Sequence, residues 1–235
     1  MCSLGEATEI RKLEPLAEAL GVFAFVMLFI WKLLLFHPWL AILVPAFTVA
    51  THVARRESIR RLGFGREEFR AALPLLVWAG AGGGLFLAAG ALAGTVRRMT
   101  AGQMALGLAA YVVWGVFQQY LLNGFLANRL AEFAGSPRSR LVPLAAAALF
   151  SLVHLPNWFL MAVTFAGGYL SVRVYQRYRS LYVLGIAHAL IAFALFLAVP
   201  DSISGHFLIG PRFVIDYYGR YPCERCTLEG IWAPK

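Results

Sequence analysis

Long apolar runs separated by short polar connections constrain this chain more than any other feature. Seven such runs lie near residues 16–36, 38–54, 71–95, 102–126, 141–158, 159–175 and 180–199. About 20 apolar helical residues are needed to cross roughly 30 Å of hydrocarbon. A composition of 60% hydrophobic and 14% charged residues also lies outside the usual balance of soluble domains. The sequence therefore predicts an all-α, polytopic integral membrane protein with about seven transmembrane helices.

Basic residues are distributed unevenly between the predicted connections. With seven spans, one side of the membrane receives 14 of the 21 Lys and Arg residues, in segments 1–15, 55–70, 127–140 and 173–179. Short loops rich in Lys and Arg stay cytoplasmic, so we expect a cytoplasmic N-terminus. Segment 55–70 mixes arginine with apolar residues, which favours a short interfacial helix. The expected partners of these arginines are membrane lipids, and no nucleic acid is expected.

The sequence divides into a membrane-embedded helical domain, residues 1–199, and a polar C-terminal tail, residues 200–235. Cys223 and Cys226 form a CxxC pair in the tail. A disulfide fits an outward-facing tail, whereas a metal knuckle would need a second pair that the chain lacks. Segment 205–211 is open to two interpretations, a lid folded back on the helices or a plain surface loop.

Two histidines and three amides stand out among the polar side chains of the apolar runs. They are His154, His188, Gln118, Gln119 and Asn123. Such side chains cost several kcal/mol in lipid unless a partner satisfies them, so they usually face a shared polar cavity. Gln119 and Asn123 are four residues apart and share a helix face. We expect three helices to converge on one site, although either histidine alone also fits a structural role as a hydrogen-bonding group between helices.

The surroundings of His154 predict an interruption of its helix. Pro156 lacks a backbone donor and leaves the carbonyl of Leu152 free, so the helix should end or kink beside the imidazole and admit water. Phe150 lies one turn earlier on the same face and would wall one side of that space. Asn157 ends the string His154-Leu-Pro-Asn and is taken as a supporting residue of the site.

Three short strings follow one another between residues 117 and 192. The first is Gln118-Gln119-Tyr-Leu-Leu-Asn123-Gly124, the second is Phe150, three residues and His154, and the third begins at His188. In order, spacing and membrane context, they resemble the motifs of the CPBP intramembrane proteases, which include CAAX prenyl-protein endopeptidases and bacteriocin-processing or immunity proteins. The resemblance implies a helical endopeptidase of a prokaryotic inner or plasma membrane, acting on membrane-associated or lipidated polypeptides.

The chain departs from the family pattern in two motifs. The family has two glutamates followed by an arginine where this chain has Gln118, Gln119 and Asn123, and an asparagine where it has Ala192. In the family, the first glutamate is thought to activate a water, and the histidines and asparagine to hold that water, stabilise the oxyanion or bind a metal. Carried over by position, the resemblance implies catalytic roles for His154, His188 and Gln118, supported by Gln119, Asn123, Phe150 and Asn157.

The missing carboxylates leave two functions open. Glutamine cannot accept a proton in the usable pH range, so neither Gln118 nor Gln119 can act as the general base. Replacing a Glu and an Arg by Gln119 and Asn123 leaves no unpaired charge. One hypothesis is an endopeptidase with a histidine as base, for which His154 is the better candidate. The other is a catalytically inactive relative that binds hydrophobic peptides as an adaptor or immunity protein.

A cofactor is a further hypothesis that the sequence leaves incomplete. His154 and His188 are competent zinc ligands, but only two strong ligands are visible. The histidines are sufficient in number to ligate a bis-histidine haem, but their spacing in the sequence does not support a haem site. His37 and His52 lie near the ends of one span, where we expect them to meet headgroups or water. A transporter would also use polar residues within the membrane, but the three ordered strings do not predict one.

Overall fold

The computed structural model describes residues 4–220, which contain helices and turns and no strand. The all-α prediction is confirmed. The first half of the chain forms α1 (Leu4–Leu28), the π-helical turn η1 (Phe29–Leu33), the 3-10 turn η2 (Pro38–Ile42), α2 (Leu43–Ala54), α3 (Arg66–Ala72) and α4 (Leu75–Leu92).

The second half begins with a continuous rod made of α5 (Ala101–Gln119), the π-helical segment η3 (Tyr120–Ala127) and α6 (Asn128–Phe133). It continues with α7 (Leu141–Leu152), α8 (Trp158–Tyr178), α9 (Leu181–Ala198), α10 (Asp201–Ser204), η4 (Gly205–Phe207) and α11 (Gly210–Arg220). Side chains start three of these helices. Thr100 and Gln103 form a capping box on α5, while Asn157 and Ser180 cap α8 and α9.

Within residues 4–220, four helical stretches are long and apolar enough to cross a membrane: Lys12–Leu33, Leu75–Leu92, Ala101–Phe133 and Leu181–Ala198. Each of the other predicted runs is also helical, but Pro38–Ala54 and Leu141–Leu152 are shorter. Helix α7 spans 12 residues, or about 18 Å at a rise of about 1.5 Å per residue. It is short because the chain turns before Pro156, as the sequence predicts.

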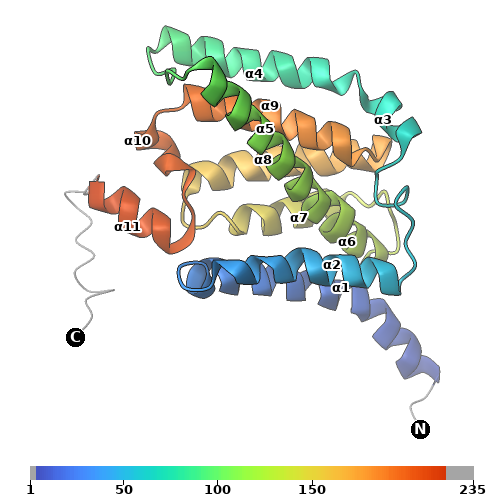
Figure 1. Ribbon diagram of the computed structural model, residues 1–235. Coiled ribbons are helices and arrows are strands. Elements are labelled where there is room, and N and C mark those ends of the chain that lie inside the picture. Colours follow the sequence, from blue (N-terminus) through green and yellow to red (C-terminus); the bar gives the residue numbers. More distant parts are fainter. Residues whose placement is uncertain (1–3, 221–235) are drawn as a thin grey trace, which may run out of the picture.

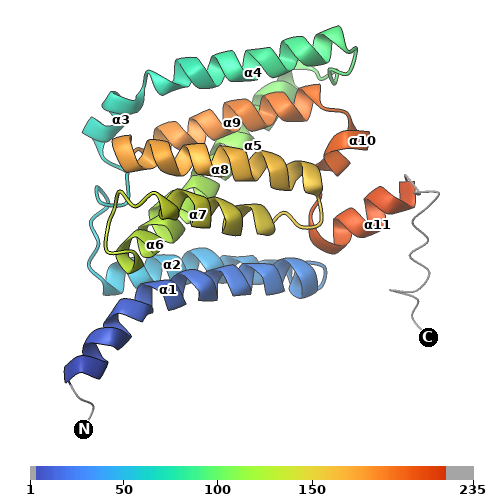
Figure 2. The ribbon, with the colours of Figure 1, turned by 180° about the vertical axis from the view of Figure 1, so that it is seen from behind.

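The helices form a layered bundle (Figures 1 and 2). In both views α4 lies at one edge and the α1–α2 hairpin at the opposite edge, with α9, α8 and α7 between them. The rod of α5, η3 and α6 runs diagonally across this stack, from the end of α4 to the hairpin. Because of this diagonal course, α5 contacts α9 and the same rod contacts α1 further along.

The connections predicted to share one side of the membrane meet at one end of the bundle. The hydroxyl of Tyr175 donates to the carbonyl of Leu62 at 3.0 Å, and the backbone N–H of Leu181 donates to the carbonyl of Gly63 at 2.8 Å. Gly63 has a φ of +99°, and a Cβ there would lie 2.8 Å from the carbonyl oxygen of Arg179. A glycine is therefore required for this close approach.

The short helix expected in segment 55–70 occupies only the end of that segment. The chain turns between α2 and α3, with a positive φ at Arg56 as well as at Gly63, and α3 begins only at Arg66. Ion pairs explain the difference, because the side chains of this connection reach inward to α1 and α6 instead of lying along one helix face.

Candidate functional site

The crossing of α5 and α9 positions the first part of the site. The helices touch at Gly115 and Gly185, where each residue faces backbone atoms of the other helix. Small residues let helix backbones approach closely in lipid. Gln119 lies one turn beyond Gly115, and His188 lies three residues beyond Gly185, so the close crossing brings the two side chains together.

Gln119 and His188 belong to a buried network of neutral side chains. The Nε2 of Gln119 lies 3.2 Å from Nδ1 of His188, and its Oε1 accepts from Nδ2 of Asn123 at 2.6 Å. Gln119 is 3% exposed and Asn123 is fully buried. The amide pair expected from the four-residue spacing is therefore present, and it replaces an ion pair without leaving a charge.

Ser171 of α8 completes this network. Its hydroxyl donates to Oε1 of Gln119 at 2.5 Å and accepts from Nδ2 of Asn123 at 2.9 Å. No pattern in the sequence pointed to Ser171. The available signal was a hydroxyl close to the Gly167–Gly168 pair in an apolar run, but serine is too common in such helices to be singled out by composition.

His154 lies in the turn that follows α7. Its Nδ1 donates to the carbonyl of Phe150 at 2.8 Å, and the two rings meet edge to face with centroids 5.1 Å apart. The predicted end of the helix beside the imidazole and the predicted contact with Phe150 are both confirmed.

A cavity of about 520 Å³ opens beside His154. One wall comes from α1, η1 and α2, and the facing wall from α5, η3 and α7. Among the described residues, the lining is aliphatic and aromatic except for Gln118 and His154. Ligand sites commonly combine an apolar concavity of this size with a few polar groups, so this cavity is the candidate binding site.

The predicted site residues thus separate into three groups. Gln118, Phe150 and His154 line the cavity, whereas Gln119, Asn123 and His188 form the adjacent network. The network adjoins the cavity because Gln118 and Gln119 are consecutive residues at the end of α5. Only the first group faces the cavity itself.

Asn157 forms the third group and anchors the C-terminal segment. Its Oδ1 caps α8 by accepting from the N–H of Leu160, and its Nδ2 donates to the carbonyls of Ser204 and Leu208 at 2.8 and 3.0 Å. The segment around η4 consequently folds back on the helices, and Ile209 lines the cavity. Cys223 and Cys226 lie outside the described residues.

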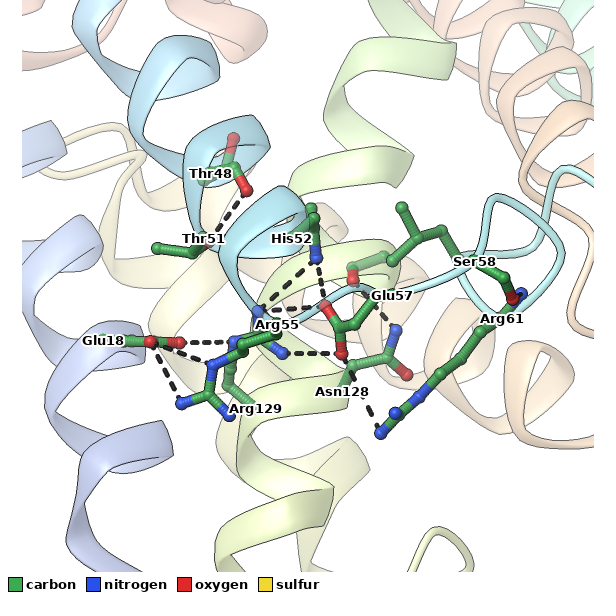
Figure 3. Close-up of polar contacts among 12 residues, drawn as sticks. Glu18, Thr48, Thr51, His52, Arg55, Glu57, Ser58, Arg61, Asn128 and Arg129 are labelled. Carbon is green, nitrogen blue, oxygen red and sulfur yellow. Dashed lines mark hydrogen bonds and ion pairs between the residues drawn. The ribbon is translucent and has the colours of Figure 1, made fainter. Parts of the chain in front are cut away.

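His52 does not lie at the headgroups or in water as expected, because it is buried in a cluster of charges (Figure 3). Its Nδ1 contacts Glu57. The carboxylate of Glu57 forms a bidentate ion pair with the guanidinium of Arg129, with N–O distances of 3.0 and 3.1 Å. Arg129 is fully buried, and its Nε lies 2.6 Å from a carboxylate oxygen of Glu18. A charge in this setting must be paired, and the cluster does so by joining α1, α2 and α6.

The pKa of the Glu57 carboxyl reflects these contacts. Burial raises this pKa, but the hydrogen bonds and charges of Arg129 and His52 outweigh the burial and lower it below its ordinary value of 4.5. Glu57 is therefore ionised at neutral pH. Because its oxygens are already bound, the cluster is best understood as a structural clamp between helices.

The described residues do not fit a zinc centre. They contain no group of three or more His, Cys, Asp or Glu side chains placed to hold a metal ion. His154 and His188 each have one ring nitrogen engaged in a hydrogen bond, which leaves one nitrogen apiece for a ligand. Two imidazoles alone leave the usual four-ligand zinc sphere incomplete.

Comparison with known proteins places these motifs in a family. Residues 100–194 match the family model described as "Type II CAAX prenyl endopeptidase Rce1-like". No curated protein and no solved structure matched the chain in the corresponding searches. The matched segment contains the whole network and the cavity-lining residues Gln118 and His154, while α1 and α2 lie outside it. The segment from 100 to 194 therefore belongs to the CPBP family, as an Rce1-like type II CAAX prenyl endopeptidase domain.

Proposed function

We propose that this protein is an intramembrane endopeptidase in which a histidine replaces the family's glutamate base. His154 is the base and Gln118 the amide that polarises the substrate carbonyl. The observation that carries the proposal is that, in the part of the chain that the structure describes, these are the two polar side chains of the apolar cavity. The Nδ1 contact with Phe150 also orients the imidazole, an arrangement typical of general bases.

The proposed reaction is hydrolysis of a peptide bond. Nε2 of His154 removes a proton from water, and the oxygen of that water attacks the carbonyl carbon. The amide N–H of Gln118 stabilises the resulting oxyanion. The C–N bond then breaks as His154 returns the proton to the leaving nitrogen, so that one water is consumed and a carboxylate and an amine are released.

The shape of the cavity supports a membrane-associated or lipidated polypeptide as substrate. An apolar concavity of about 520 Å³ has room for a hydrocarbon chain or several apolar side chains. Burial of such groups contributes about 25 cal/mol per Å² of apolar surface. The clustering of the basic connections at one end of the bundle supports a cytoplasmic N-terminus with that end facing the cytoplasm.

A specific observation favours a second function, that of a catalytically inactive binding protein. No carboxylate lines the cavity among the described residues. The oxygen and nitrogen of the Gln119 amide are already hydrogen-bonded within the network. A protein with this cavity and no base would retain hydrophobic or lipidated peptides without cleaving them, as an adaptor or immunity protein.

The decisive experiment measures cleavage of a lipidated CAAX-type peptide in proteoliposomes. We expect a defined fragment from the native protein and none from His154→Gln. His37→Gln is the matched control, because His37 is exposed at a helix end and should not matter. Absence of product from the native protein would reject the endopeptidase.

Gln118→Glu separates the two functions. If His154 already serves as base, the added carboxylate should change the rate little. If the protein is an inactive relative, the variant should gain cleavage by about 10²–10⁴-fold, the usual contribution of a general base. Binding of the uncleaved peptide to the native protein should persist in the second case.

A further inference from the structure

The hydrogen bonds around the two buried imidazoles determine which ring nitrogen carries the proton. A neutral imidazole has one N–H donor and one acceptor nitrogen, and the partner of the first nitrogen decides the state of the second. Both rings use Nδ1 toward the protein. In the described residues, neither His154 nor His188 makes a hydrogen bond through Nε2.

At His154 the partner is an acceptor. The carbonyl oxygen of Phe150 lies 2.8 Å from Nδ1 and can only accept a hydrogen bond. Nδ1 must therefore carry the hydrogen. In the neutral ring, Nε2 of His154 is then the unprotonated nitrogen, with its lone pair available.

At His188 the partner is a donor. The Oε1 atom of Gln119 already accepts from Asn123 and from the hydroxyl of Ser171 at 2.6 and 2.5 Å, so the amide NH₂ is the group that faces Nδ1 of His188. Nδ1 must accept, and a neutral His188 then carries its hydrogen on Nε2. In a doubly protonated His188, the Nδ1–H would face the amide NH₂ of Gln119, so that two donors would point at each other.

The reverse orientation of the Gln119 amide is less favourable. It would turn the amide of Asn123 as well, so that the Asn123 oxygen faced Gln119 and Ser171 while its NH₂ lost both acceptors. Asn123 is fully buried, and its oxygen is the atom that now has no partner among the described residues. An orphaned carbonyl oxygen is tolerated better than an orphaned N–H donor, which favours the present orientation.

We infer that the two histidines are held as opposite neutral tautomers, with Nε2 of His154 as an acceptor and Nε2–H of His188 as a donor. Ser171 is the positioning residue that keeps the amide of Gln119 in the required orientation. This inference rests on the proposed function for its catalytic meaning, because an unprotonated Nε2 is what a general base at His154 requires.

Histidine-selective ¹⁵N NMR of the full-length protein in lipid nanodiscs tests the assignment without any substrate. The two tautomers differ in the chemical shifts of their ring nitrogens and in the couplings to the ring protons. His154→Gln and His188→Gln assign the signals. We expect the Nδ1–H form at His154 and the Nε2–H form at His188. The same tautomer at both rings, or a doubly protonated His188, would overturn the inference.

Gln119→Glu provides a directed test of the mechanism. At a pH above the pKa of the introduced carboxyl, the ionised side chain has only acceptor oxygens, so Nδ1 of His188 would have to become a donor, and the His188 signal should change to an Nδ1–H form. Gln103→Glu is the matched control, because it adds the same charge to the same helix while Glu at that position still completes the capping box. An unchanged His188 signal in a folded Gln119→Glu protein would contradict the assignment.

Substitutions at Ser171 test its positioning role. Ser171→Ala removes one of the two donors to Gln119 and should give a second His188 signal from the reversed amide. Ser171→Thr keeps the hydroxyl and should restore the native signal. The NMR result is independent of turnover. Opposite tautomers without cleavage would support this inference and reject the endopeptidase. Cleavage with identical tautomers would support the endopeptidase and reject this inference.

Discussion

Gly115 of α5 faces the backbone of Gly185 of α9 so closely that a Cβ atom on Gly115 would lie 2.6 Å from the carbonyl oxygen of Gly185. This contact sets the separation of the two helices that carry Gln119 and His188. The hydrogen bond between those side chains spans 69 positions of the chain. It therefore depends on a packing contact that lies a turn away from either residue.

Gly115→Ala should separate these helices. The added methyl meets backbone atoms, which cannot rotate away, and overpacking of this kind costs about 1–3 kcal/mol. We expect a lower Tm in thermal unfolding and a changed His188 signal. Gly167→Ala is the control, since a Cβ there meets nothing within 4 Å. Equal Tm values for the two variants would show that the crossing is not tight.

Arg129→Met should destabilise the bundle strongly. It leaves the buried Glu57 without its main partner, and breaking a buried ion pair by removing one member costs about 3–5 kcal/mol. Arg60→Met is the comparison, because Arg60 makes its ion pairs with Glu67 and Glu68 at the surface. We expect Arg60→Met to leave the Tm nearly unchanged. A mild effect of Arg129→Met in detergent and in lipid would argue against the clamp.

Acidification should weaken the same cluster. Because the folded-state pKa of Glu57 is lowered below its ordinary value of 4.5, the carboxylate stabilises the folded protein above that pH. This contribution is lost as the pH falls through the lowered pKa. The Tm difference between the native protein and Glu57→Gln should therefore shrink on titration from neutral to acidic pH. A difference that stays constant over this range would contradict the prediction.

Two substitutions at Asn157 should separate its roles. Asn157→Asp retains an acceptor for the N–H of Leu160 but cannot donate to the carbonyls of Ser204 and Leu208. Asn157→Ala loses both functions. We expect faster amide hydrogen exchange around η4 in both variants, and an additional loss of about 0.5–2 kcal/mol for the lost cap only in Asn157→Ala. Unchanged exchange in Asn157→Asp would mean that other contacts hold the segment.

The sequence determined the class of the protein and its local geometry. Apolar length predicts helices in a membrane because each helix satisfies its own backbone hydrogen bonds. The four-residue spacing of Gln119 and Asn123 predicts their contact, since it depends only on helical periodicity. The effect of Pro156 on α7 is likewise local. The ordered motifs were sufficient to place the segment in its family.

Only the tertiary structure decided which of these residues share a surface. The walls of the cavity come from helices far apart in the chain, and Ser171 joins Gln119 from 52 positions away. His52 lies next to Arg129 beside the turn between α2 and α3, in a segment where the sequence pattern favoured a helix. Such contacts follow from helix crossings and close backbone approaches, which periodicity does not encode. The tautomers of His154 and His188 are decided at this level, because each depends on whether the neighbouring atom donates or accepts.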